Sequence, residues 1–366
     1  MKQGWEIKKI RDICDKASSN IVQNKISELD GDYPVYGASG YVQNVDFFHR
    51  DSPYIGIVKD GAGVGRVNIY PAYSSLLGTL QYIIPKDGYL LEYVAYALKG
   101  LNLASYASGA TIPHIYFKNY GETEISVAPL AEQEKIVAEL DCLSGIIEKK
   151  KQQLKELDAL AQSIFYTMFG DPITNEKGWE VKKLGEVAYI GLGFTHTPEY
   201  VDDGIAFLSV KDISGGEICW DNIKYISKEE YDSAPKGAKP NKGDIMFCRV
   251  GTMGKPVIVD TDIPFCTFVS LGYLHLLNND MLNIYVKHWM QSYAFDAQVE
   301  ENVKGVAIKN LNTGWLKTFN IQHPPIALQQ EFAEKIEAIE KQKELIKQSI
   351  TETETLFNSR MDYYFK

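Results

Sequence analysis

The sequence predicts an α+β protein in which two related mixed α/β domains are joined by two long antiparallel coiled-coil helices, giving a pseudo-twofold repeat. Three observations support this fold class. The chain of 366 residues is longer than a single hydrophobic core usually supports. Several short motifs occur twice in the same order, and each copy ends in a long stretch with a seven-residue apolar period. We therefore expect domains at residues 1–128 and 170–323, and helices at residues 129–169 and 324–366.

The two copies of the repeat match at their ends and diverge in their middles. The first motif lies 174 residues from its copy and the last motif 196 residues from its copy, so the second copy holds 22 more residues. This pattern indicates a duplicated framework with different contents. The matching segments are "GWEIKKIRDI" with "GWEVKKLGEV" (from Gly4 and Gly178), "DGAGVGR" with "RVGTMGK" (from Asp60 and Arg249), "LEYVAYAL" with "NIYVKHWM" (from Leu91 and Asn283), "SGATIPHI" with "KGVAIKNL" (from Ser108 and Lys304), and "VAPLAEQEKIVAEL" with "HPPIALQQEFAEKI" (from Val127 and His323).

The first domain is expected to mix strands with a short helix. β-Branched and aromatic residues predict strands at "SPYIGIVK" and "TLQYIIP", and a short helix follows at "LEYVAYALKG". The glycine-rich "GAGVGR" (residues 61–66) lies between strands, so we interpret it as a hairpin turn. It is unlike a phosphate-binding loop, because no helix pattern follows it.

The first long helix is predicted by apolar residues that advance in alternating steps of four and three. Pro129 suits the first helical turn, where its missing N–H has no cost. Glu132 and Glu134 suit the positive end of the helix dipole, and Gly170 is a typical helix stop. The residues predicted to form the coiled-coil seam are Ile136, Leu140, Leu143, Ile147, Leu154 and Leu157.

The second domain and second helix repeat this arrangement. Strands are predicted at "GDIMFCRV", "KPVIVD" and "LGYLHLL", followed by a short helix at "NIYVKHWMQS". We expect the two long helices to pack antiparallel, because each follows its own domain. Lys150, Lys343 and Arg360 interrupt the seams at different levels, which would fix the register. The seam residues predicted in the second helix are Ile336, Ile339, Ile346 and Ile350.

Composition and charge limit the possible functions. The N-terminus has no apolar run, so we expect no signal peptide, and no apolar segment is long enough to span a membrane. Five cysteines with irregular spacing suit a reduced cytoplasm. The six scattered histidines suggest no metal site. The net charge of −10 argues against a basic nucleic-acid-binding module. DNA binding would need local basic loops or a partner that supplies phosphate contacts.

The sequence holds no catalytic motif that we can identify. It has no Walker lysine, no nucleophile elbow and no Asn/Asp-Pro-Pro-aromatic tetrapeptide of the kind found in amino-methyltransferases. The segment "HPPI" at residues 323–326 lacks both the polar first residue and the aromatic. We therefore expect a protein that is not an enzyme.

At this point the chain resembles the specificity subunit of a type I restriction-modification system. The resemblance rests on "PLAEQEKIVAEL", its second copy and the "MFGDPITNEKGWEVKKLGEV" junction at residues 168–187, and it covers the whole chain. It implies two target-recognition domains that each recognise one half of a split, asymmetric DNA sequence. It also implies two methyltransferase subunits and motor-nuclease subunits as partners, which use S-adenosylmethionine, ATP and Mg²⁺, whereas this chain binds no cofactor. Adenine methylation or restriction would then be directed by this chain and catalysed by those partners.

Candidate DNA-binding residues are polar side chains on glycine-rich loops, selected partly by their equivalent positions in the two domains. Base edges are recognised by polar side chains, whereas phosphate contacts position the protein. Gln133 and Gln329, near the two helix starts, are candidate partner-binding residues. The DNA-binding candidates are Ser39, Tyr41, Gln43, Asn44, Lys59, Arg66, Thr111 and His114 in the first domain, and Thr195, His196, Lys211, Arg249, Thr252, Lys255, Lys304 and Lys309 in the second.

Two other functions stay open at this stage. One is a protein-binding scaffold built on an intramolecular coiled coil, and the other is an enzyme that uses the glycine loop. The duplicated motifs favour recognition of a split DNA sequence over both. All of the candidate residues also have a simpler interpretation as solvated loop or helix residues.

Overall fold

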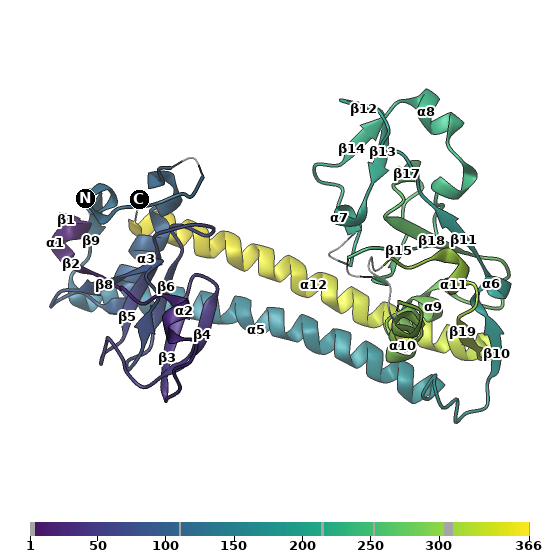
Figure 1. Cartoon of the computed structure of the whole chain (residues 1–366), viewed down its shortest axis with the longest axis horizontal. Helices are drawn as coiled ribbons and strands as arrows, with labels where there is room; N and C mark the ends of the chain where they lie inside the picture. The colour runs from purple at the N-terminus through teal and green to yellow at the C-terminus, as the bar shows by residue number, and fades with distance from the viewer. Residues whose placement is uncertain (1–3, 110, 214–215, 252, 304–309, 366) are drawn as a thin grey trace. The chain divides into compact units, whose positions relative to one another are not determined.

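The computed structural model describes residues 4–109, 111–213, 216–251, 253–303 and 310–365 (Figure 1). The chain forms two compact units. Unit 1 comprises Met1–Gln152 and Ile346–Lys366, and unit 2 comprises Gln153–Leu345. Each long helix therefore contributes one half to each unit.

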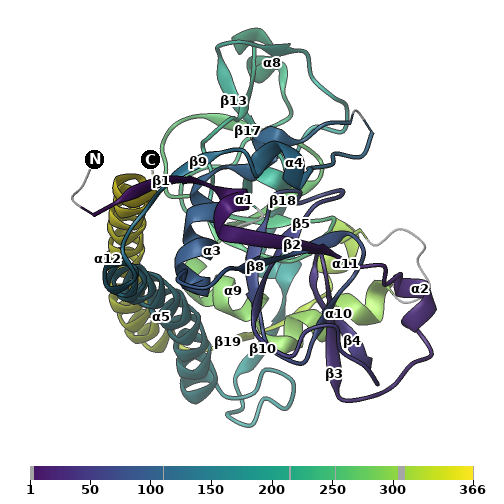
Figure 2. The same ribbon diagram turned by 90° about the vertical axis from the view of Figure 1, so that its left-hand side faces the viewer.

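Unit 1 is centred on a four-stranded antiparallel sheet in the order β2-β8-β5-β6, three strands of which are labelled in Figure 2. Both predicted strands are confirmed, as β5 and β8. The helix α3 (Leu91–Gly100) is also confirmed, and its buried residues pack into the same core as β5 and β8. The sheet consists of β2 (Cys14–Ser18), β5 (Tyr54–Val58), β6 (Val67–Tyr70) and β8 (Leu80–Pro85).

Unit 1 also has a smaller sheet, in the order β4-β3-β7, and an antiparallel ribbon that leads into the first long helix. In the small sheet β3 pairs antiparallel with β4 and parallel with β7. The elements are β1 (Glu6–Lys9), α1 (Ile10–Ile13), α2 (Gln23–Ile26), β3 (Tyr33–Gly37), β4 (Gly40–Val45), β7 (Ser75–Leu76), the 3₁₀ helix η1 (Leu103–Tyr106), α4 (Phe117–Tyr120) and β9 (Glu124–Val127).

Unit 2 repeats the main sheet with the strand order β11-β18-β15-β16, and the ribbon β10-β19 replaces β1-β9. The three predicted strands are confirmed, as β15, β16 and β18. The elements of this framework are β10 (Glu180–Lys183), α6 (Leu184–Val187), β11 (Ala188–Leu192), β15 (Ile245–Cys248), β16 (Val257–Ile258), β18 (Leu271–Leu276), α9 (Asn283–Met290), α10 (Tyr293–Val303), α11 (Thr313–Leu316) and β19 (Asn320–His323).

The second sheet of unit 2 is larger than that of unit 1 and accounts for the divergent middle of the repeat. It has the order β12-β14-β13-β17, and β13 pairs parallel with β17 as β3 does with β7. Its elements are β12 (Tyr200–Val201), β13 (Ile205–Leu208), α7 (Val210–Ile213), β14 (Lys224–Ile226), α8 (Lys228–Ser233), the 3₁₀ helix η2 (Lys236–Ala238) and β17 (Phe265–Thr267).

The structure corrects one detail of the predicted repeat. The sequence pairs Asp60 with Arg249, but the backbone pairs Lys59 with Arg249. The N–H of Ile115 donates to the carbonyl of Lys59 at 2.9 Å, and the N–H of Leu311 donates to the carbonyl of Arg249 at 2.8 Å. The glycine loop of unit 2 is one residue shorter, so an alignment without a gap displaces its first residues by one position.

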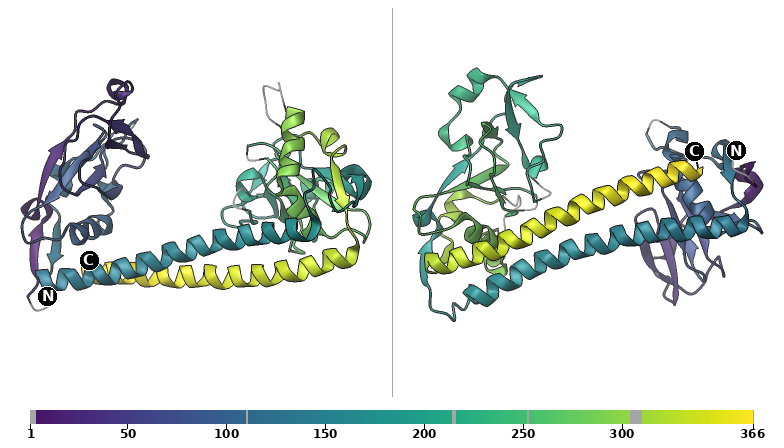
Figure 3. Two further views of the ribbon diagram at one scale, coloured as in Figure 1. Left: turned by 90° about the horizontal axis from the view of Figure 1, so that it is seen from below. Right: turned by 180° about the vertical axis from the view of Figure 1, so that it is seen from behind.

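The two long helices are α5 (Leu130–Phe169) and α12 (Ile326–Phe365), each 40 residues long. Each begins just after a proline whose carbonyl accepts the first helical hydrogen bonds. Gly170, with φ +78°, ends α5 as predicted. Within each unit the two helices lie side by side and run antiparallel (Figure 3). The predicted fold class is confirmed.

Each helix pair is part of its unit's hydrophobic core. In unit 1, Ile136 and Leu140 of α5 and Met361 of α12 pack against the residues of α3. In unit 2, Phe165 of α5 and Phe332 of α12 belong to the core formed by β11, β15, β18 and α9. The helices are therefore structural parts of both units, and the burial of their apolar faces stabilises each unit.

The three cations that interrupt the seams each have a partner on the opposite helix. Lys150 Nζ donates to the hydroxyl of Ser349, Lys343 Nζ lies 2.8 Å from Asp158, and the guanidinium of Arg360 donates to both oxygens of Glu139. Such partners favour one register, because a shift of either helix would leave a half-buried charge unpaired.

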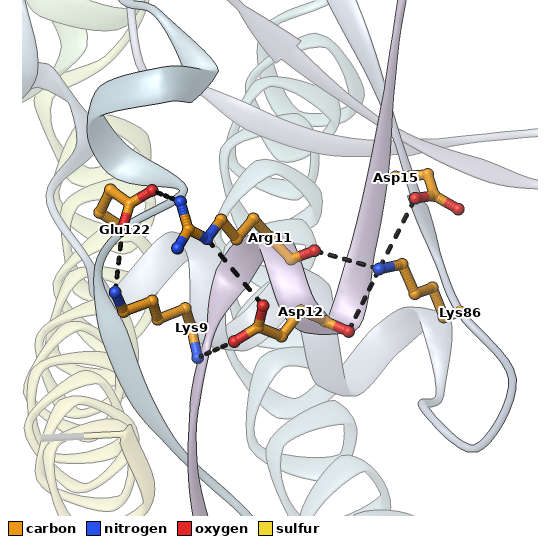
Figure 4. Close-up of polar contacts among 6 residues, drawn as sticks. All are labelled: Lys9, Arg11, Asp12, Asp15, Lys86 and Glu122. Atoms are coloured by element: carbon orange, nitrogen blue, oxygen red, sulfur yellow. Dashed lines mark hydrogen bonds and ion pairs between the residues drawn. The ribbon is translucent and has the colours of Figure 1, made fainter.

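An exposed polar cluster ties α1 to the rest of unit 1 (Figure 4). The carboxylate of Glu122, between α4 and β9, accepts hydrogen bonds from Lys9 and Arg11. Lys86 Nζ donates to the carbonyls of Arg11 at 3.1 Å and Asp12 at 3.3 Å. A cation at these carbonyls satisfies the acceptors at the end of this short helix.

Candidate nucleic-acid interface

A groove with a volume of about 710 Å³ lies at one edge of unit 1. Three segments that are distant in sequence form it: the residues after β2, the β3–β4 turn and the β7–β8 connection. Small residues make up much of its lining, so another backbone can approach closely. The lining residues are Ile21, Val22, Gln23, Gly37, Ala38, Ser39, Gly40, Tyr41, Val42, Leu77, Gly78 and Thr79.

Two of the predicted DNA-binding residues, Ser39 and Tyr41, line this groove. The side chain of Tyr41 is 62% exposed. A third predicted residue, Arg66, is also exposed, and its Nη1 donates to the carbonyl of Ala38 at 3.0 Å. The structure therefore brings Ser39, Tyr41 and Arg66 together, although Arg66 comes from the glycine loop between β5 and β6.

The glycine loop is a hairpin turn that reaches the wall of the groove. The N–H of Lys59 donates to the carbonyl of Thr79 at 3.0 Å, and the N–H of Gly65 donates to the carbonyl of Val58 at 2.8 Å. A Cβ on Gly65, whose φ is +87°, would lie 2.6 Å from the backbone nitrogen of Ala104. A glycine is therefore required there for close approach to η1, as well as for its backbone conformation.

Lys59 and His114, both predicted DNA-binding residues, meet at the carboxylate of Asp60. His114 Nδ1 lies 2.7 Å from Asp60 Oδ1, and Lys59 Nζ forms an ion pair with Asp60 Oδ2. Although burial raises the pKa of Asp60, the hydrogen bonds from His114 and Lys59 outweigh that effect and lower it below its ordinary value. The two basic residues were predicted from the sequence and Asp60 was not, although Asp60 is the first residue of the quoted motif and directly follows Lys59.

The other predicted residues of unit 1 lie outside this group. Gln43 Nε2 donates to the backbone carbonyls of Ile26 and Leu29, so its amide nitrogen holds the segment after α2 and is not available to a base. Asn44 is half-buried in β4 opposite Pro34, and Thr111 is exposed. The prediction that Gln43 contacts DNA stays a prediction, limited to its amide oxygen.

Backbone hydrogen bonds identify the equivalent edge of unit 2. In unit 1 the N–H of Leu77 donates to the carbonyl of Tyr36 at 2.8 Å. In unit 2 the N–H of Phe268 donates to the carbonyl of Leu208, also at 2.8 Å. Tyr36 and Leu208 are therefore equivalent, but the chain continues into the β3–β4 turn with Ser39 in unit 1 and into α7 with Lys211 in unit 2. Lys211, a predicted DNA-binding residue, is exposed and lies three residues after Leu208.

Thr195 and His196 also lie at this edge of unit 2. The N–H of Gly78 donates to Ile21 O, and the N–H of Val269 donates to Phe194 O, each at 2.8 Å. Thr195 and His196 follow Phe194 just as the groove residues Val22 and Gln23 follow Ile21. Both are exposed, and His196 Nε2 lies 3.9 Å from a carboxylate oxygen of Glu230.

Arg249 is not available to DNA in this structure. It is only 7% exposed, and its guanidinium donates to the carbonyls of Leu311 at 3.0 Å and Val269 at 2.8 Å. Burial lowers the pKa of Arg249 from its ordinary value. Lys255, in contrast, is exposed at a position comparable to Arg66. The prediction that Arg249 contacts DNA is wrong, because its guanidinium is buried and donates to two backbone carbonyls of unit 2. Thr252, Lys304 and Lys309 lie outside the described residues.

Gln133 and Gln329 are not partner-binding residues, because both are buried in their own unit, at 1% and 0% exposure. Gln133 Oε1 accepts from the N–H of Leu90 at 3.0 Å, and Gln329 Oε1 accepts from the N–H of Leu282 at 2.8 Å. Each amide nitrogen donates to a carbonyl just before its own long helix. The two glutamines therefore fasten α5 to the start of α3 and α12 to the start of α9.

Replacing Gln329 by alanine should lower the free energy of unfolding of unit 2 by about 1–3 kcal/mol, because the buried N–H of Leu282 loses its acceptor. Urea denaturation monitored by tryptophan fluorescence measures the change. Gln330, exposed on the same helix and in the same unit, provides the matched control, and its alanine variant should stay within about 0.5 kcal/mol of wild type. Equal losses in the two variants would contradict the assigned role.

Every predicted seam residue is buried or half-buried in its unit. Ile136, Leu140 and Ile147 of α5 are at most 7% exposed, and Ile336 and Ile339 of α12 are likewise at most 7% exposed. The remaining predicted seam residues are the half-buried Leu143, Leu154, Leu157 and Ile346, and Ile350, which is 8% exposed.

None of the described helices is long and apolar enough to cross a membrane.

Comparison with known proteins gives a match over most of the chain. The model of the type I restriction modification DNA specificity domain matches residues 2–159 and 176–355. The chain is 26% identical, over 90% of its length, to the type I restriction enzyme MjaIX specificity subunit of Methanocaldococcus jannaschii, of which it covers 85%. It is 24% identical, over 70% of its length, to the EcoBI specificity subunit of Escherichia coli, of which it covers 60%.

Two solved structures share the fold. The type I restriction-modification system S subunit from M. genitalium aligns with a TM-score of 0.57 at 15% identity, covering 99% of this chain and 96% of that chain. A chain from a study of complex assembly and conformational transition of the type I restriction-modification system aligns with a TM-score of 0.56, also at 15% identity, covering 98% of this chain and 97% of that chain. At such identities the two structures support the fold alone.

Proposed function

The chain belongs to the type I restriction-modification DNA specificity family, and we propose that it recognises an asymmetric bipartite DNA site, one half with each unit. As a specificity subunit it determines which DNA sequence the system acts on. One observation carries the bipartite proposal: the two units share one framework but present different side chains at the same edge. The groove residues Val22 and Gln23 of unit 1 correspond to Thr195 and His196 of unit 2, and the strand that leads to the turn with Ser39 in unit 1 leads to α7 with Lys211 in unit 2.

The proposed DNA-binding residues are the exposed and half-buried candidates at these two edges. Polar and aromatic groups around a groove of small residues suit contacts with base edges, and exposed cations suit contacts with phosphates. Asn44 and Thr111 stay predictions at the margin of the unit 1 edge. The proposed set is Ser39, Tyr41, Lys59, Arg66 and His114 in unit 1, and Thr195, His196, Lys211 and Lys255 in unit 2.

We further propose that the chain itself is not an enzyme and works with two methyltransferase subunits and motor-nuclease subunits in the cytoplasm. In this proposal S-adenosylmethionine, ATP and Mg²⁺ bind to those partners. The net charge of −10 is unfavourable for binding phosphates. We therefore expect the methyltransferase subunits to supply most of the cationic surface, so that the isolated chain binds DNA weakly.

The outer faces of the long helices are the proposed docking surface for the methyltransferase subunits, in place of the two buried glutamines. Apolar side chains off the seam are exposed there, and in this proposal the methyltransferase subunits would cover them. They are Ile146 at 37%, Leu160 at 47%, Leu345 at 62% and Leu356 at 50% exposure.

The proposed function is tested by co-expressing the chain with its methyltransferase subunit in an unmethylated host and sequencing the genome for N6-methyladenine. A split motif with two different halves and a constant gap is the expected result. Exchanging residues 1–128 for those of a relative should change one half only. If an intact complex produced no methylation, the protein-binding scaffold would become the better explanation.

Arg66→Ala should reduce DNA affinity of the complex about threefold to tenfold at moderate salt and leave the recognised sequence unchanged, because a phosphate contact carries no base information. Fluorescence anisotropy at several salt concentrations should show that the slope of log affinity against log salt concentration becomes smaller by about one, which corresponds to one counterion fewer released. Lys255→Ala is the equivalent change in unit 2 and should behave alike. Lys16→Ala, which removes an exposed cation of β2 that does not line the groove, is the control. A changed methylation motif would contradict a phosphate role for Arg66.

A further inference from the structure

Asp60 lies beside the groove of unit 1, since its N–H donates to the carbonyl of the groove residue Thr79 at 3.3 Å, although it bears the same charge as DNA. Its two carboxylate oxygens are engaged by different residues, Oδ1 by His114 Nδ1 at 2.7 Å and Oδ2 by Lys59 Nζ. Only 24% of its side chain is exposed. The carboxylate therefore lies behind the two basic residues and has little freedom to contact a ligand itself.

This arrangement determines which atom of His114 is available. An ionised carboxylate can only accept hydrogen bonds, so Nδ1 of His114 must carry the proton that it donates to Asp60. The side chain of His114 is 39% exposed, and its Nε2 has no hydrogen-bond partner among the described residues. In a neutral imidazole held this way, Nε2 is an acceptor for an exocyclic amino group such as those of adenine and cytosine in the major groove.

Unit 2 has the same backbone contact without an Asp–His pair. In unit 1 the N–H of Ile115 donates to the carbonyl of Lys59, and in unit 2 the N–H of Leu311 donates to the carbonyl of Arg249. The residues that correspond to Asp60 and His114 are Val250 and Asn310, which form the equivalent antiparallel bridge. The pair is thus an addition of unit 1 on a shared backbone, at an edge where the two units are expected to differ in specificity.

We propose that Asp60 is a positioning residue for DNA recognition by unit 1. Asp60 acts through His114, because its carboxylate fixes the imidazole with Nε2 directed away from the carboxylate. The same carboxylate holds the ammonium group of Lys59 beside the imidazole. The inference rests on the proposed function, and it assigns to unit 1 a means of base discrimination that unit 2 lacks.

The test measures initial methylation rates by the complete complex with its methyltransferase subunit, on the cognate duplex and on duplexes with one base pair changed in either half. Asp60→Asn should reduce discrimination at one or more positions of the unit 1 half about tenfold, and should leave the unit 2 half unchanged. His114→Asn, which installs the residue present in unit 2, should reduce discrimination at the same positions. In the His114→Asn background, Asp60→Asn should add less than a twofold change, and Asp60→Glu should restore discrimination in part.

The matched control is Asp46→Asn, an exposed carboxylate of unit 1 outside the edge, which should leave all ratios unchanged. Unchanged discrimination in Asp60→Asn would overturn the inference, and so would independent, multiplicative effects of the Asp60 and His114 substitutions. An equal loss in both halves with a lowered melting temperature would assign Asp60 a structural role instead and would also overturn it. A wild-type complex that methylated no defined sequence would refute the proposed function itself, which is a distinct result.

Discussion

Replacing Phe332 by alanine is expected to lower the free energy of unfolding of unit 2 by about 3–5 kcal/mol, because it removes a large, fully buried ring from the core. The ring centroid of Phe332 lies 5.2 Å from that of Phe169 and 5.9 Å from that of Phe165, both on α5. It lies 5.2 Å from the ring centroid of His288 on α9. It therefore joins the two long helices to each other and to the globular part of the unit. The cavity left by alanine would cost packing energy on all three sides.

Denaturation in urea monitored by circular dichroism would measure this loss, and Leu345→Ala is the matched control. Leu345 lies on the same helix but is 62% exposed, so its truncation should change the free energy of unfolding by less than about 0.5 kcal/mol. In the complex, Phe332→Ala should weaken recognition of the unit 2 half-site before that of the unit 1 half-site. If both variants lost the same stability, the central packing role of Phe332 would be wrong.

The fold could be predicted because its main features are periodic. A seven-residue apolar period and a duplicated set of motifs depend on local sequence, so the bounds of α5 and α12 agree with the prediction to within two residues at each end. The strands β5, β8, β15 and β18 were predictable for the same reason, since their β-branched and aromatic runs end at glycine or aspartate. The second sheet of unit 2 is larger than the second sheet of unit 1, and this difference was indicated only by the 22 additional residues.

The side chains of the candidate site were harder to predict, because their availability depends on tertiary contacts. Gln133 and Arg249 look like surface residues in the sequence, yet both are buried against backbone groups that come from elsewhere in the chain. A buried polar side chain has no periodic signal of its own when its partners are carbonyls. The correspondence of Thr195 and His196 with the groove residues Val22 and Gln23 was also hidden, since the two segments share no motif and only matching backbone hydrogen bonds relate them.

His288 should make unit 2 unfold more easily in acid. Burial, with smaller contributions from the charges of the neighbouring Lys287 and Lys343, lowers the pKa of His288 from its ordinary value of 6.5 to about 3. Its two ring nitrogens have no hydrogen-bond partner among the described residues. The equivalent residue of unit 1, Tyr96, instead donates to Asp141 at 2.6 Å. His288 is therefore neutral in the folded protein and gains a proton when the protein unfolds.

Because the pKa is lower in the folded state than in the unfolded state, the contribution of His288 to stability is complete above pH 6.5 and is lost as the pH falls towards 3. The loss between pH 7 and pH 4 should be roughly 3 kcal/mol. Urea denaturation at half-unit pH intervals measures it. His288→Met removes the titrating group, so the dependence of the unfolding free energy on pH should become shallower by about 1.4 kcal/mol per pH unit.

The control for this series is His196→Gln, because the side chain of His196 is 67% exposed and its loss should leave the pH dependence nearly unchanged. Other groups also titrate between pH 4 and pH 7, and for this reason the decisive quantity is the difference in slope between wild type and His288→Met. A difference close to one proton would identify His288 as the buried neutral base of unit 2. Parallel curves would mean that the folded protein already carries a proton on His288, and the ring would then need an acceptor that the present packing with Phe332 does not provide.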